Sequence, residues 1–90
     1  MSFAVKTSYD LFRIEPKIKS LHNKIEMVYT SWLYEGSPVI EIVLGVSSVQ
    51  EFLVLRNALL KQVCAIVTNE VRFSTNDKET MKGVRDYDAA

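Results

Sequence analysis

The chain has 90 residues, of which 48% are apolar, and its eleven basic and eleven acidic side chains cancel. That apolar content supports one folded domain and excludes a disordered chain, while the neutral balance argues against a dedicated nucleic-acid binder, which usually carries a basic excess. A single cysteine, Cys64, excludes a secreted disulfide scaffold. No signal-peptide core stands near the start and no apolar run approaches ~20 residues, so a cytoplasmic protein without a membrane span is expected.

The first 34 residues predict a strand followed by a helix. Residues 2–9 follow a period of two, which indicates a half-buried strand, although a mobile terminus is the alternative. From Leu11 to Trp32, apolar residues recur at alternating spacings of three and four, the a/d pattern of a helix. Proline suits the first helical turn and is costly deeper inside, so the helix is expected to begin near Glu15 or Pro16.

The end of this helix is open, because residues 25–34 fit two structures. They are rich in Val, Tyr, Thr and Trp, which favour strands. A hairpin that runs from Ile25 through the Gly36–Ser37–Pro38 turn to Val46 therefore competes with the helix. The length of the heptad match favours the helix.

The stretch from Val39 to Val46 is β-branched with only one charge, which predicts a buried strand; a short helix over Ser37–Leu44 is the alternative. Ser48 stands three residues before Glu51, the spacing of a capping box, so a helix should start there and run to about Asn69. Its polar residues form only one narrow stripe. A helix this apolar should be covered on more than one side.

The remaining segments complete an α+β prediction. Residues 71–74 indicate a weak last strand, and the polar residues 76–90 indicate a flexible tail after a compact domain formed by residues 1–75. The predicted order is strand, helix, strand, helix and weak strand in two layers, with both helices on one face of the sheet. The alternative is an all-α antiparallel hairpin of helices 16–34 and 38–69 that oligomerises.

Residue types that carry chemistry are sparse. His22 is the only histidine and lies four residues before Glu26, which on a helix is more simply a surface pair than a catalytic base. Gly45 precedes the capped helix, but a phosphate loop needs further glycines. Cys64 lies in the apolar helix and is expected in the core. Neither catalytic activity, nor a cofactor, nor a metal site is expected.

The excess apolar surface of the second helix predicts self-association. We therefore expect a small protein-interaction module, a homodimer or higher oligomer, that binds another protein and regulates or scaffolds it. The residues expected at the protein interface are Trp32, Leu53, Leu60, Val63 and Val67.

The alternative function is association with nucleic acid through the basic first helix. Residues 1–24 carry a net charge of +3, whereas residues 25–55 carry −4. The residues expected to contact nucleic acid are Arg13, Lys17 and Lys24, and Tyr9 and Phe12 could add base stacking. Steep salt dependence would separate this alternative from an apolar protein interface.

Overall fold

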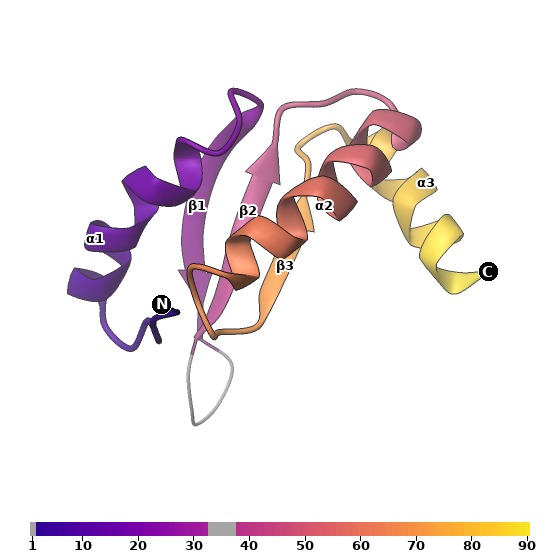
Figure 1. Ribbon diagram of the computed structural model, residues 1–90. Coiled ribbons are helices and arrows are strands. Elements are labelled where there is room, and N and C mark those ends of the chain that lie inside the picture. The colour runs from indigo at the N-terminus through magenta and orange to yellow at the C-terminus, as the bar shows by residue number, and fades with distance from the viewer. Residues whose placement is uncertain (1, 33–37) are drawn as a thin grey trace.

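A three-stranded mixed sheet organises the chain. The computed structural model describes residues 2–32 and 38–90, in which three helices and three strands follow the order helix, strand, strand, helix, strand, helix (Figure 1). The elements are α1 (Ser8–Lys19), β1 (Ile25–Ser31), β2 (Val39–Leu44), α2 (Val49–Cys64), β3 (Val71–Ser74) and α3 (Lys78–Ala89). The predicted α+β class is confirmed, and the all-α alternative is wrong. The order differs in detail, because the chain begins with a helix and ends with one.

The central strand β2 pairs antiparallel with β1 and parallel with β3. Strand β2 is buried at five of its six positions, as its β-branched sequence predicts. The side chains of Ile40, Ile42 and Leu44 are fully buried and belong to the main apolar cluster. This strand therefore forms the floor of the core.

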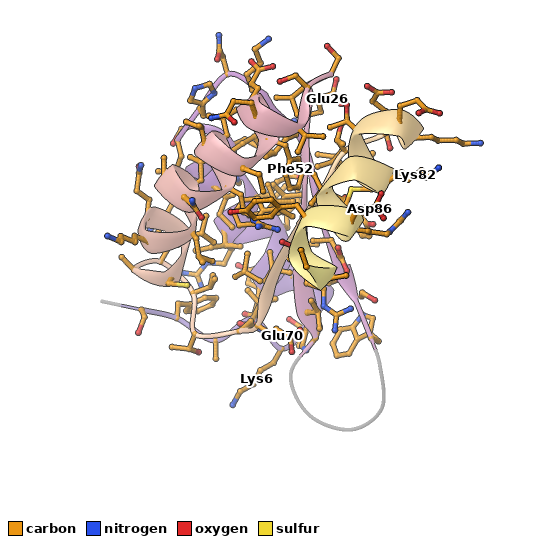
Figure 2. The ribbon with its side chains drawn as sticks, turned by 90° about the vertical axis from the view of Figure 1, so that its right-hand side faces the viewer. Lys6, Glu26, Phe52, Glu70, Lys82 and Asp86 are labelled. Atoms are coloured by element: carbon orange, nitrogen blue, oxygen red, sulfur yellow. The ribbon has the colours of Figure 1, made fainter. Side chains whose placement is uncertain are left out.

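All three helices contribute to a single core. Ile14 and Ile18 of α1, Phe52 of α2 and Val84 of α3 pack in the same cluster as the core-facing side of the sheet. Helix α2 crosses in front of the sheet in Figure 1, and Phe52 points into the interior in Figure 2. Helix α3 packs mainly against α2. The core thus lies on one face of the sheet.

The helix predicted over residues 25–34 is wrong, because Ile25–Ser31 form strand β1. A β-bulge lies between Ile25 and Met27, and it adds one residue to the strand. The competing hairpin prediction has the correct strands. Gly36 and Ser37 of its predicted turn lie outside the described residues.

The predicted strand over residues 2–9 is also wrong. Only Phe3 forms a β-bridge, to Val67, and helix α1 already begins at Ser8. A capping box starts it: the Asp10 N–H donates to the Thr7 hydroxyl at 3.2 Å, and the Thr7 N–H donates to the Asp10 carboxylate at 3.2 Å. The backbone N–H of Lys6 also donates to this carboxylate, and that bond lowers the pKa of Asp10.

Pro16 lies inside α1 and not at its start. Its missing N–H leaves the carbonyl of Phe12 without the usual helical donor. Pro16 and Phe12 are both on the exposed side of the helix, where water can bind that carbonyl. Helix α1 therefore tolerates a proline that the sequence pattern alone assigns to a first turn.

Asn69 joins three segments at the end of the domain where β2 begins. Helix α2 ends at Cys64, so Asn69 lies beyond it in the loop before β3. The Val5 N–H donates to Asn69 Oδ1 at 2.8 Å, and Asn69 Nδ2 donates to the carbonyls of Val5 and Pro38, both at 2.9 Å. Asn69 is buried, so these bonds replace water for three backbone groups.

Residues 76–90 were expected to form a flexible tail, and this prediction is wrong because they contain α3. Val84 is buried in the core, and Thr80 is buried with its hydroxyl donating to the Asp77 carboxylate. Arg56 of α2 also holds Asp88 through two hydrogen bonds. None of the described helices is long and apolar enough to span a bilayer.

Candidate interaction surfaces

The face of the sheet opposite the core carries no helix in the described part of the chain. Strand alternation places Val39 and Val43 of β2 on this helix-free face, since Ile40 and Ile42 point into the core. Both valines are 4% exposed. Along β1, the same side presents Met27, paired with Val43, and Tyr29, which are 50% and 41% exposed. The helix-free face therefore combines an apolar centre with half-exposed large side chains at one edge.

A row of polar side chains crosses the middle of this face. Glu41 of β2 pairs in register with Tyr29 on one side and with Arg72 on the other. Arg72 donates to Glu70 at 2.9 Å, an exposed pair. Glu41 is half-buried and makes no ion pair with any described residue. The row thus presents one carboxylate and one guanidinium side by side, and each can form an ion pair with a charged group of another molecule.

The structure divides the predicted interface residues into two groups. Val63 and Val67 are fully buried in the core, and Leu53 packs against it, so these side chains contact neighbours of the same chain. Leu60 is 40% exposed on α2, and Trp32 is 55% exposed just after β1. The apolar excess of α2 is therefore covered largely by the sheet and by α3. Of the five predicted interface residues only Leu60 and Trp32 remain accessible to a partner, and Val54 of α2, which was not predicted, is also exposed.

The predicted basic residues are likewise divided. Arg13 and Lys17 line one groove, with a volume of about 560 Å³, together with side chains from the N-terminal segment and from the end of α2. Lys24 lies elsewhere, in a second hollow beside Gly45. Arg13, Lys17 and Lys24 were predicted to lie together because one helix was expected to continue through residue 34. The turn after α1 separates Lys24 from the other two.

The second hollow is acidic. It is lined by the carboxylates of Glu26, Glu51 and Asp77 as well as by Lys24, and Glu26 packs over Gly45 at 2.9 Å from the position that a Cβ would take. Three carboxylates around one lysine repel a phosphate. The glycine before α2 therefore does not belong to an anion site. Among the described residues, no group of three His, Cys, Asp or Glu side chains could hold a metal ion.

His22 and Cys64 occupy positions that differ from the predictions. His22 lies in the turn between α1 and β1, where its Nδ1 accepts a hydrogen bond from the Lys24 N–H at 3.0 Å. The predicted pairing of His22 with Glu26 on one helix is wrong, since Glu26 belongs to β1. Cys64 is exposed rather than buried, because it is the last residue of α2.

Comparison with known proteins gives no match, whether to a family model, a curated protein or a solved structure. Function must therefore be argued from the surfaces of this chain.

Proposed function

We propose that this chain is a protein-interaction module that self-associates through the helix-free face of its sheet. The observation that carries the proposal is the exposure of Met27 and Tyr29 beside Val39 and Val43, on a sheet whose other face is fully covered. In folded domains, a sheet with an apolar central strand is normally covered on both faces by helices or by another sheet. Val39 and Val43 are already buried within the chain, so a second copy would cover chiefly Met27 and Tyr29.

Charge also favours a second copy as the partner. Glu41 and Arg72 are direct neighbours in the register. A twofold axis that runs along the strands, between β2 and β3, sets each Glu41 opposite Arg72 of the other copy. The contact is then made twice, as in other isologous interfaces. The helix-free face is therefore complementary to itself in charge and exposes apolar side chains along β1.

The size of the face sets the expected strength of the dimer. Strand β2 has six residues, so the face extends about 20 Å along the strands and about 14 Å across the three of them. Its footprint of about 300 Å² is well below the ~800 Å² that each partner contributes to a stable interface. We expect weak dimerisation that depends on protein concentration, the behaviour of a reversible regulatory contact.

Analytical ultracentrifugation over a wide concentration range tests the face with two matched variants. Met27→Glu adds a charge to the helix-free face, and Leu60→Glu makes the same kind of change at a similarly exposed position on α2. We expect Met27→Glu to weaken dimerisation at least tenfold and Leu60→Glu to leave it unchanged. A wild-type protein that stays monomeric at millimolar concentration would overturn the proposal, as would the opposite ranking of the variants.

Two charge variants test whether the partner is a second copy. Glu41→Arg gives a face with two basic residues, and Arg72→Glu gives a face with two acidic ones. Each variant alone should dimerise less than the wild type, whereas an equimolar mixture should form heterodimers. This complementation cannot arise from contacts within one chain. Its absence, with both variants folded by circular dichroism, would contradict the twofold pairing of Glu41 with Arg72.

A further inference from the structure

The groove between α1 and the end of α2 has a composition of its own. Its lining side chains are two cations, apolar residues and one serine: Ser2, Phe3, Arg13, Ile14, Lys17, Ala65 and Ile66. No described acidic residue is among them. The N-terminal wall is fixed, because the Thr68 N–H donates to the Phe3 carbonyl at 3.0 Å. The groove is thus an apolar trough with positive charge along one side, a combination that suits an anion with an apolar or aromatic body.

The two cations are placed by the helix that carries them. Arg13 and Lys17 are four residues apart on α1, so they lie one above the other at a separation of ~6 Å. The Arg13 guanidinium lies over the Phe3 ring, with its Cζ 5.7 Å from the ring centroid, which holds it at the groove. This spacing is similar to that of consecutive phosphates along an extended nucleic-acid strand.

Exposed aromatic side chains continue this row. Tyr9 stands four residues before Arg13, and both lie on the outer side of α1, while Phe12 lies on the adjoining strip. Tyr9 is 70% exposed and Phe12 is 77% exposed, the largest values among the large apolar side chains described. Folding leaves these two rings uncovered, although each could bury more than 150 Å². Bases stack on such rings whatever their sequence.

The acidic residues of α1 oppose this surface only in part. The Asp10 carboxylate is already bound by the backbone N–H groups of Lys6 and Thr7 at the start of the helix. Glu15 lies on another side of α1, about 160° around the axis from Lys17. Asp10 partly offsets the charge of Arg13, whereas Lys17 has no acidic residue three or four positions away on α1, so the row keeps a net positive charge although the whole chain is neutral.

From these observations we infer that the row Tyr9–Arg13–Lys17, with Phe12 and the adjoining groove, binds single-stranded nucleic acid. The two cations contact consecutive phosphates, and Tyr9 and Phe12 stack on bases. Such binding is independent of sequence. It does not rest on the proposed dimer, because the groove and the helix-free face lie on opposite sides of the sheet.

Fluorescence anisotropy with a labelled 12-nucleotide oligo(dT) tests this inference. Each phosphate contact on a single strand contributes a slope of ~0.7 to the fall of log affinity with log salt. Two contacts predict affinity about 25-fold lower at 500 mM than at 50 mM salt. The Arg13→Ala/Lys17→Ala variant should lose this salt dependence. The matched control, Lys82→Ala/Arg85→Ala, removes two exposed cations from α3 (Lys82 is labelled in Figure 2) and should behave as the wild type.

Stacking is tested separately. Tyr9→Ala/Phe12→Ala should weaken binding at least about fivefold with an unchanged salt slope. Tyr87→Ala removes an aromatic ring of similar exposure, 61%, from α3 and is the control. A photocrosslinker attached to Cys64, the residue before Ala65 of the groove, should label the oligonucleotide.

Three results would overturn the inference. One is absence of binding at 50 mM salt, and another is equal loss in the groove variants and their α3 controls. The third is binding to vesicles that contain phosphatidylserine without binding to the oligonucleotide, which would identify the basic and aromatic row as a membrane-surface contact instead. Each variant should fold, since all substituted side chains are exposed, and circular dichroism checks this.

Discussion

The two sides of β2 differ in one residue that decides what each can contact. Ile40, Ile42 and Leu44 are all aliphatic and meet the three helices, whereas the other side places Glu41 between Val39 and Val43. A carboxylate in the middle of a covered core would cost several kcal/mol without a partner. A strand that is buried on both sides therefore need not belong to a closed core on both sides. One side packs against the helices, and the other is the side on which the proposed dimer contact would form.

The largest expected effect is a difference in the free energy of unfolding between substitutions at neighbouring positions of β2. Ile42→Ala should lower the free energy of unfolding by about 4 kcal/mol, because it leaves a cavity under α2. Glu41→Ala should change it by less than ~1 kcal/mol, as at a surface position. Urea denaturation at low protein concentration measures both in the monomer. Similar losses for the two variants would mean that the helix-free face is a second core.

Asn69→Leu should be the next most destabilising change. It tests whether the covered side needs buried hydrogen bonds besides apolar packing. Leucine has about the same size but leaves the Val5 N–H and the carbonyls of Val5 and Pro38 without their partners. Each unsatisfied buried group costs about 1–3 kcal/mol, so a loss of at least ~3 kcal/mol is expected. Hydrogen exchange should show the Val5 amide losing protection first. A variant as stable as the wild type would show that water replaces these bonds.

The sequence predicted the parts of the covered side that follow simple periods. The Ser48-x-x-Glu51 spacing marks the start of α2 correctly, and one half of the predicted capping box forms, in which the Ser48 hydroxyl accepts the Glu51 N–H at 3.0 Å. The β-branched stretch after residue 38 is β2, and residues 71–74 are β3. These signals are local, and the elements that they predict are present in the structure.

The failures have a physical cause in the bulge of β1. Because the bulge adds one residue, Ile25 and Val28 both face the core although they are three residues apart. A spacing of three is also the helical spacing, so β1 continued the pattern of α1 and imitated a longer helix. The separate error at residues 2–9 could have been corrected by the Thr7-x-x-Asp10 capping spacing, which places the helix start at residue 8.

The candidate surfaces were predicted less well than the fold, because exposure is a tertiary property. Arg13 and Lys17 were identified from charge alone, and the groove beside them could not be. The row Tyr29–Glu41–Arg72 depends on two strand pairings, between residues 12 and 31 positions apart in the sequence, which no local pattern reveals. The single charge in β2 was the available sign that one side of that strand differs from the other.

Shortening Val84 tests how far the core extends beyond the sheet into α3. Val84→Ala should lower the free energy of unfolding by about 2 kcal/mol, because this side chain is 1% exposed in the core. Tyr87→Ala, on an exposed position of the same helix, should have little effect. Thermal unfolding followed by circular dichroism compares the two. Equal stability of the Val84 variant and the wild type would mean that residues 76–90 do not contribute to the stability of the core.

The smallest expected effect concerns the exposed pair that joins α3 to α2. Hydrogen bonding to Arg56 lowers the pKa of Asp88 below its ordinary value of 3.8. A folded-state pKa below the unfolded value means that the pair stabilises the fold above about pH 4, and that this contribution disappears as the pH falls through the lowered pKa. Asp88→Asn should therefore lower Tm slightly at pH 7, with the difference from wild type vanishing once the pH falls below the lowered pKa of Asp88. Asp86→Asn, on the same helix in Figure 2 but without an ion pair to a described residue, is the matched control. A Tm difference that persists unchanged at acid pH would mean that Asp88 acts through packing, and that α3 is held by its apolar contacts alone.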